Sequence, residues 1–228
     1  TSDFLTAYPE VGPLYSKLAE CLNVDRKQVF LAAGSDAVIK AIFEVYVDPG
    51  DEVIIIHPTY GMYYVYSKMF QARLIEVCFD ENLVLSPKQL IAKISPATKL
   101  ICIANPNSPT GTIISIEDLE NIIAVASKNG SLVLIDEAYY QFLGHSMVGR
   151  TAAYDNLIVT QTFSKALGLA SVRLGYIVSN LDIVSHLHRV RPMYEVNAFA
   201  VGLGLYLLQN PNLVAGHVKE ISRARRWL

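Results

Sequence analysis

The sequence is poor in charge. Lysine, arginine, aspartate and glutamate make up 18% of its 228 residues, against about 25% in an average globular protein. The two signs nearly cancel to a formal net charge of −2, and the chain has no basic block. This excludes the electrostatic pattern of proteins that bind nucleic acid or anionic membranes. Hydrophobic residues make up 52%, which predicts a sheet covered on both faces or a large subunit interface.

Cysteine is also scarce. Cys21, Cys78 and Cys102 are isolated, and none has the spacing of a metal site or of a redox pair, so we expect no metal and a reducing compartment. The chain has no apolar run of the roughly 20 residues that a membrane span needs, and no signal peptide opens it. We therefore expect a soluble cytoplasmic protein. Repeats and low-complexity segments are absent too, and the lone Gly202-Leu203-Gly204 lies in an apolar helical run, which indicates close packing.

Apolar, strand-like runs alternate with helical segments along the chain. The runs cover residues 29–33, 52–56, 73–79, 99–104, 132–135, 156–160 and 174–178. Helical patterns cover residues 14–22, 37–47, 86–94 and 115–129, then continue from 182 through 194 and over 199–208. This alternation predicts an α/β fold with three layers, in which helices cover both faces of a mainly parallel central sheet.

We expect three parts in the chain. Residues 1–22 form an entry segment and a helix, residues 23–208 a large domain, and residues 209–228 the start of a helix that leads to a small domain, truncated or absent here. The sequence begins inside a loop pattern and stops within a helical one, so either end could be a truncation.

Two charged residues follow buried strands. Lys165 comes shortly after the run 157–159, and for such a lysine two interpretations are open: a solvated surface residue, or an amine that forms a Schiff base with an aldehyde cofactor. Asp136 comes directly after the fully apolar run 132–135. A buried carboxylate needs a cation or a strong donor, and a protonated ring nitrogen would serve; a helix cap is the alternative.

Further polar residues follow other strands. Gly34-Ser35-Asp36 opens a helix, where Ser35 or Asp36 could cap the first turn or the free N–H groups could bind a phosphate. Tyr60 could stack on a flat cofactor or pack in the core. The loop 105–112 holds two prolines and many amides and hydroxyls, and is either a plain turn or a rigid arm toward a ligand. In a parallel sheet all these strand ends share one edge.

Six motifs occur together, in order, over nearly the whole chain. They are Tyr8-Pro9-Glu10, Gly34-Ser35-Asp36, the run 58–63 (Pro-Thr-Tyr-Gly-Met-Tyr), the loop 105–111, Asp136-Glu137-Ala138-Tyr139, and Ser164-Lys165 with Arg173. In this combination the sequence resembles the class I/II, fold-type I aminotransferases that depend on pyridoxal 5′-phosphate, and most closely the histidinol-phosphate aminotransferase group.

The resemblance implies a role for each motif. Lys165 would carry the cofactor as a Schiff base and move the proton during catalysis. Asp136 would pair with the pyridinium nitrogen, Tyr139 and the Asn107 loop would hydrogen-bond the 3′ oxygen, and Tyr60 would stack on the ring. The phosphate would be bound by Gly34, Ser35, Asp36, Thr162, Ser164 and Arg173.

The resemblance also implies a homodimer, because the family's tyrosine at the position of Tyr8 reaches the phosphate of the neighbouring subunit. Two features depart from the family. Ser108 stands where the family often has asparagine, so either Asn107 or Ser108 faces the cofactor. The family's arginine for the substrate carboxylate lies in a C-terminal domain beyond the end of this chain.

The implied activity is transfer of an amino group to a 2-oxo acid from a donor such as histidinol phosphate or an aromatic amino acid. Two alternatives stay open. A decarboxylase or lyase could use the same fold and cofactor, since the fold does not select the reaction. The chain could also be a non-catalytic domain that binds pyridoxal phosphate in a regulator.

Overall fold

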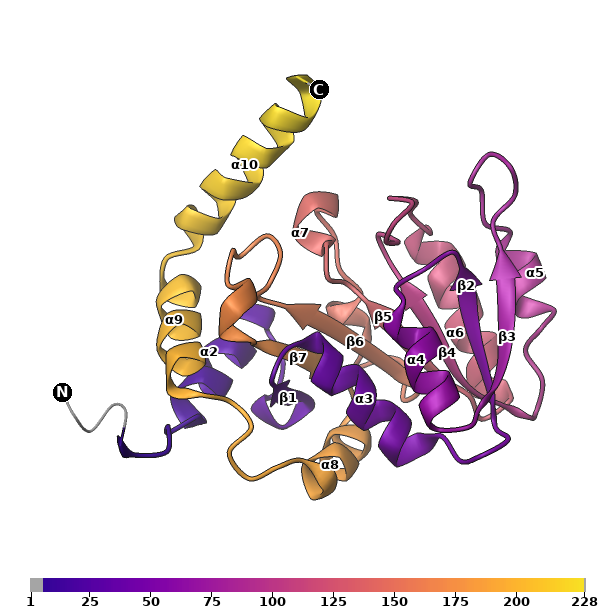
Figure 1. Ribbon diagram of the computed structural model, residues 1–228, viewed down its shortest axis with the longest axis horizontal. Coiled ribbons are helices and arrows are strands. Elements are labelled where there is room, and N and C mark those ends of the chain that lie inside the picture. Colours follow the sequence, from indigo (N-terminus) through magenta and orange to yellow (C-terminus); the bar gives the residue numbers. More distant parts are fainter. Residues whose placement is uncertain (1–5, 228) are drawn as a thin grey trace.

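The computed structural model describes residues 6–227 and has a seven-stranded sheet at its centre (Figure 1). The strands lie in the order β1-β7-β6-β5-β4-β2-β3. Their bounds are β1 Val29–Ala32, β2 Glu52–His57, β3 Arg73–Cys78, β4 Thr98–Ala104, β5 Leu132–Asp136, β6 Leu157–Thr162 and β7 Gly175–Val178.

One strand of this sheet runs against the others. β7 is antiparallel to both of its neighbours, whereas β6, β5, β4, β2 and β3 pair in parallel. The sheet is therefore mainly parallel, as the sequence predicts. The reversal has a consequence for the site: the start of β7 lies at the same edge as the ends of the other six strands, where Gly175 pairs with Ala32 on one side and Thr162 on the other.

Helices cover both faces of the sheet, and alternate strand residues point to each face. On one face, Ile54 and Ile56 pack in the core beneath α2 (Gly12–Leu22), α5 (Pro87–Ile91), α6 (Ile116–Lys128) and α9 (Ala198–Gln209). On the other, Val53 and Ile55 pack beneath α3 (Ser35–Tyr46), α4 (Met62–Met69) and α8 (Leu181–Val190). The three-layer architecture is confirmed.

Short polar side chains fix where several helices begin. Ser86 and Ser115 accept hydrogen bonds from the backbone of Gln89 and Asp118, as expected of N-caps. The helix expected from 182 through 194 instead ends at Val190. Arg191 is extended there because it precedes Pro192, and a new helix begins only after Asn197.

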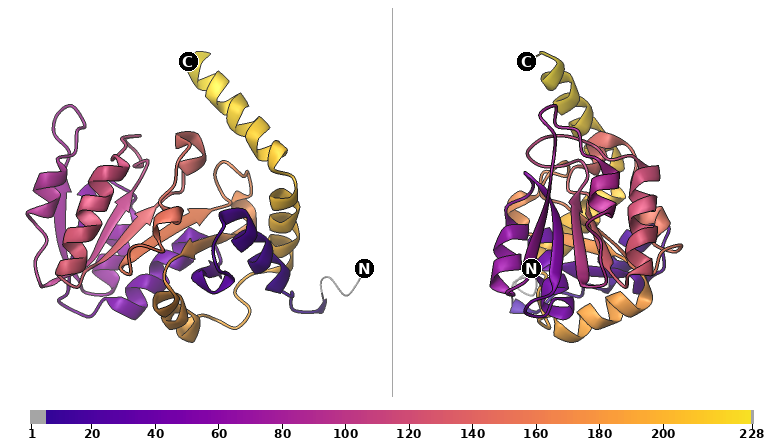
Figure 2. Two further views of the ribbon diagram at one scale, coloured as in Figure 1. Left: turned by 180° about the vertical axis from the view of Figure 1, so that it is seen from behind. Right: turned by 90° about the vertical axis from the view of Figure 1, so that its right-hand side faces the viewer.

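The last helix leaves the body of the molecule. α10 (Pro211–Trp227) follows α9 and contacts α7 (Tyr140–Leu143), then projects outward (Figure 2). Three short 3-10 helices, η1 (Arg26–Gln28), η2 (Val148–Arg150) and η3 (Ala170–Val172), complete the elements. None of the helices in residues 6–227 has the length and apolar character to cross a bilayer.

Candidate active site

A cavity opens at the sheet edge where six strands end. Its walls include side chains from five separate segments of the chain, which the parallel topology brings together. The polar and aromatic residues that line it are Ser35, Tyr60, Ser108, Asp136, Tyr139 and Lys165. The predicted convergence of strand ends is thus present in the structure.

Asp136 is the buried acid of this cavity. It is the last residue of β5 and is only 4% exposed. Its Oδ2 accepts a hydrogen bond from the Tyr63 hydroxyl at 2.9 Å, and its Oδ1 one from the Ala138 N–H at 3.0 Å. Burial nevertheless raises the pKa of Asp136 to about 6, because two neutral donors replace only part of the lost hydration. A cation placed in the cavity would stabilise this carboxylate.

Lys165 lines the same cavity as Asp136. It is exposed, in the turn that follows β6. Its Nζ is 5.3 Å from the centre of the Tyr139 ring, within the range of a cation–π contact. Asp136 ends β5 and Lys165 follows the neighbouring strand β6. An amine and a carboxylate therefore face one shared space.

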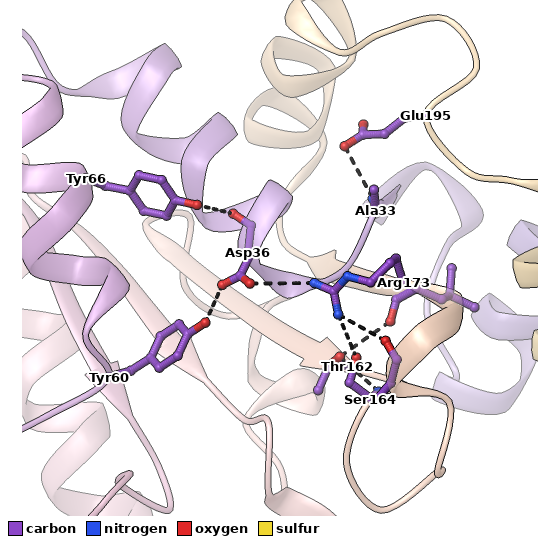
Figure 3. A network of polar contacts seen from close by, with 10 residues as sticks. Ala33, Asp36, Tyr60, Tyr66, Thr162, Ser164, Arg173 and Glu195 are labelled. Carbon is purple, nitrogen blue, oxygen red and sulfur yellow. Dashed lines mark hydrogen bonds and ion pairs between the residues drawn. The ribbon is translucent and has the colours of Figure 1, made fainter.

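Arg173 forms a positively charged corner beside the cavity (Figure 3). It lies two residues before the start of β7 and adopts a left-handed backbone with φ 56°. Its Nη1 donates to Ser164 Oγ at 3.4 Å and to the Ala170 carbonyl at 3.2 Å, and its Nη2 lies 3.6 Å from Asp36 Oδ2. The reversed direction of β7 is what brings this arginine to the ends of the parallel strands.

The start of α3 faces the same corner, and its cap differs from the prediction. Gly34 is the N-cap, with φ 90° and no side-chain hydrogen bond, so the expected cap by Ser35 or Asp36 is wrong. A Cβ on Gly34 would lie 2.5 Å from Arg173 Nη2, which only glycine avoids. The Asp36 carboxylate instead accepts the Tyr60 hydroxyl at 2.5 Å. The first N–H groups of α3 thus have no side-chain cap beside a guanidinium, an arrangement suited to an anion.

The loop 105–112 presents Ser108 to the cavity. Asn107 is buried, and its amide bonds within the protein: Nδ2 donates to the Pro58 carbonyl at 2.9 Å and to Thr110 Oγ1 at 2.8 Å, while Oδ1 accepts from Thr59 at 2.8 Å. Ser108 lines the cavity together with Lys165. Of the two alternatives, Ser108 is the side chain at the cavity wall.

Two other predicted residues lie outside the cavity. Thr162 is buried, and its hydroxyl accepts from the Ser164 N–H at 3.1 Å and donates to the Leu174 carbonyl at 3.4 Å. Tyr8 is 70% exposed and stacks on Tyr194 with 3.7 Å between the ring centres. Thr162 can act on the site only through the loop that carries Ser164, and Tyr8 is free to meet another molecule.

Tyr63 is a site residue that the sequence did not reveal. We expect a core aromatic at this position from its spacing, and its ring is indeed fully buried. Its hydroxyl, however, bonds Asp136. The available signal was its position three residues after Tyr60, since side chains at i and i+3 of a helical segment lie on the same side.

A larger hollow adjoins the cavity. It has a volume of about 400 Å³ and shares Pro106, Ser108 and Tyr139 with the first cavity. Its other walls include Phe142 of α7 and Arg225 of α10. The shared residues join this hollow to the cavity that Lys165 lines, which leaves space for a second small molecule next to that cavity.

This fold and this arrangement define a class of protein. The family model of class I and II aminotransferases matches residues 8–226, and the chain belongs to this family. It is 39% identical over 230 residues to the histidinol-phosphate aminotransferase of Dehalococcoides mccartyi, a match that covers all of this chain and 63% of the relative. It is 36% identical over 203 residues to that of Caldanaerobacter subterraneus, covering 89% of this chain and 57% of the relative.

Solved structures share the fold. The histidinol-phosphate aminotransferase of Clostridium acetobutylicum superposes with a TM-score of 0.89 at 24% identity, over 97% of this chain and 67% of that one. The enzyme of Sinorhizobium meliloti, solved in complex with pyridoxal 5′-phosphate, gives a TM-score of 0.88 at 21% identity, over 99% of this chain and 62% of that one. The chain spans roughly three fifths of the length of its curated relatives.

Proposed function

We propose that this chain is the cofactor-binding part of an aminotransferase that depends on pyridoxal 5′-phosphate. The observation that carries the proposal is that Lys165 and Asp136 line one and the same cavity. The family membership and the names of the relatives support it.

The residues present fit this cofactor. Asp136 is a buried carboxylate with neutral donors only, and a protonated ring nitrogen supplies the cation that it lacks. Gly34 leaves room at the start of α3 beside Arg173, where a phosphate would meet N–H groups and a guanidinium. When bound, pyridoxal phosphate supplies a sink for the electrons released at the substrate's Cα.

Each residue then has a definite task. Lys165 Nζ would hold the cofactor and, once substrate has freed it, would serve as the base that takes the proton from the substrate's Cα. The Asp136 carboxylate would stabilise a protonated ring nitrogen. Tyr60 would pack on the ring, and the Tyr139 hydroxyl would donate to the 3′ oxygen. Ser164, Arg173 and the first turn of α3 would hold the phosphate.

The hollow beside Lys165 supports a donor with a sizeable side chain. We propose histidinol phosphate or an aromatic amino acid as donor and 2-oxoglutarate as acceptor, which agrees with the names of the relatives. We also propose that residues 23–208 form the large, cofactor-binding domain. We also propose a homodimer in which Tyr8 reaches the phosphate site of the other subunit.

The visible absorbance of the purified protein with added cofactor tests this function. We expect a band that borohydride removes, and that Lys165→Ala abolishes while Lys128→Ala, on the exposed end of α6, keeps it. Addition of histidinol phosphate should shift the band and yield the keto product. Release of CO2 from an amino acid would favour the decarboxylase, and absence of the band from the wild-type protein would contradict the proposal.

A further inference from the structure

A buried polar network lies next to the cavity in the chain, starting at the residue after Asp136. Its centre is Glu137, the residue after Asp136, which is 3% exposed. The Glu137 carboxylate accepts hydrogen bonds from the Met147 N–H at 2.6 Å, from the Ser146 hydroxyl at 2.5 Å and from Gln161 Nε2 at 2.7 Å. Tyr176 of β7 in turn donates to Gln161 Oε1.

All the donors to Glu137 are neutral, and no cation lies within ion-pair distance of it in the described residues. Burial raises the pKa of Glu137 in spite of its three hydrogen bonds. An ionisable group in such surroundings adds little to stability compared with a well-packed neutral one. The network is therefore better explained by the side-chain positions that it fixes than by the stability that it adds.

The hydrogen bonds of Glu137 close a loop. The segment 138–147 leaves the end of β5 and returns to Glu137 through the Ser146 and Met147 bonds. This segment carries Tyr139, whose ring lies 5.3 Å from Lys165 Nζ. Apart from this closure, the segment around Tyr139 is held by local bonds, from the Ala138 N–H to Asp136 and within the four-residue helix α7.

The same carboxylate joins this loop to the strand that delivers the lysine. Gln161 lies in β6, four residues before Lys165. Its bond to Glu137 therefore links the loop that carries Tyr139 to the strand that carries Lys165. The backbone agrees, since the Glu137 N–H donates to the Thr160 carbonyl at 2.8 Å.

We propose that Glu137 is a positioning residue, which sets Tyr139 against Lys165 by tying the segment 138–147 to Gln161 of β6. This role rests on the proposed function, because Tyr139 and Lys165 act there on the cofactor. Glu137 itself does not line the cavity. It acts through Tyr139.

The test replaces a buried carboxylate by its amide in the cofactor-loaded protein, at Glu137 and at a control position, and measures the pH at which the visible cofactor band changes. Glu137→Gln puts an amide NH2 against the donors of Ser146 and Gln161. We expect the pH midpoint of the visible cofactor band to shift by about one unit, since a hydrogen bond to one protonation state changes a pKa by that order. The exchange Glu137→Gln with Gln161→Glu restores a donor–acceptor pair and should return the midpoint toward the wild-type value.

Glu52→Gln is the matched control. Glu52 is 7% exposed, accepts from Ser95 and Thr98 and forms an ion pair with Arg73 at 2.8 Å, but it lies at the opposite end of the sheet. It should lower the melting temperature without moving the midpoint. If Glu137→Gln unfolds the protein, Ser146→Ala removes one donor without a change of charge and should shift the midpoint less, in the same direction. An unmoved midpoint in every folded variant of this network would overturn the proposal, whereas a wild-type protein without any band would refute the proposed function instead.

Discussion

At the residue scale, Asp136 illustrates how a site residue opposes stability. Its carboxyl has a pKa of about 6 in the folded chain, against 3.8 for the free side chain. Between these pH values the folded state holds more protons than the unfolded state, so the free energy of unfolding falls as the pH rises from 4 to 6. A shift of about two units corresponds to a loss of about 3 kcal/mol. A cofactor cation would offset this cost.

Asp136→Asn should therefore stabilise the cofactor-free protein at pH 8. We expect a gain of about 1–2 kcal/mol, less than the full shift because the amide NH2 faces one of two donors and loses a hydrogen bond. Below pH 4 the gain should vanish, since the wild-type carboxyl is neutral there. Urea unfolding at both pH values measures the difference. The same variant should lose aminotransferase activity, and an equal stability change at both pH values would contradict the argument.

A second prediction at this scale concerns the hydrogen bond from Tyr63 to Asp136. Its hydroxyl lowers the pKa of Asp136 by donating to the carboxylate. Tyr63→Phe should therefore raise that pKa by about one unit and move the acid limb of the kcat/KM profile to higher pH by the same amount. Tyr66→Phe is the control, because its hydroxyl donates to the Asp36 carbonyl at 3.4 Å and does not bond Asp136. Identical profiles for the two variants would show that the Tyr63 bond has no influence.

At the scale of elements, the packing of α3 on β7 depends on Gly175. A Cβ there would lie 2.3 Å from the Ser35 backbone nitrogen, and backbone cannot yield as a flexible side chain can. Gly175→Ala should push the start of α3 away from Arg173. We expect a loss of about 1–3 kcal/mol in the free energy of unfolding together with weaker binding of the cofactor.

Gly216→Ala should have the opposite effect on the free energy of unfolding. Gly216 lies in α10 with open space where its Cβ would be, so alanine should stabilise the helix by about 0.5–1 kcal/mol and leave cofactor binding unchanged. Thermal unfolding and cofactor titration of the two variants measure both effects. Equal cofactor affinity in Gly175→Ala and wild type would contradict the role given to this contact.

Elements with strong local signals could be predicted from the sequence, and elements set by tertiary contacts could not. The apolar runs at 132–135 and 156–160 and the helical pattern at 115–129 match β5, β6 and α6 to within two residues. The reversal of β7 has no local signal, because strand direction follows from pairing. The cap of α3 was missed because Arg173, 139 residues after Gly34, determines which residue fits there.

At the scale of the whole molecule, the candidate site follows from topology more than from any motif. Parallel strands bring Tyr60, Asp136 and Lys165 to one edge, and this convergence could be predicted. The sequence did not determine whether Ser108 or Asn107 lines the cavity. It also did not determine that the Tyr63 hydroxyl donates to Asp136. These depend on side-chain directions that only the packed loops determine.

Apolar side chains remain exposed at the end of the molecule where Tyr8 lies. Tyr8, Met193, Tyr194 and Tyr206 are all more than half exposed, which is characteristic of a surface that another molecule covers. This supports the proposed homodimer, in which each site would take Lys165 from one subunit and Tyr8 from the other.

Mixing one inactive variant with one that binds the cofactor more weakly tests that arrangement. Lys165→Ala removes the amine, and Tyr8→Ala should weaken the affinity for the cofactor about tenfold, the loss of roughly one hydrogen bond to a phosphate. After denaturation and joint refolding in equal amounts, half of the dimers are mixed, and in these one of the two sites has both an intact Lys165 and an intact Tyr8. At limiting cofactor we expect about a quarter of the wild-type activity. Activity no higher than the mean of the two variants alone would show that each site is complete within one chain.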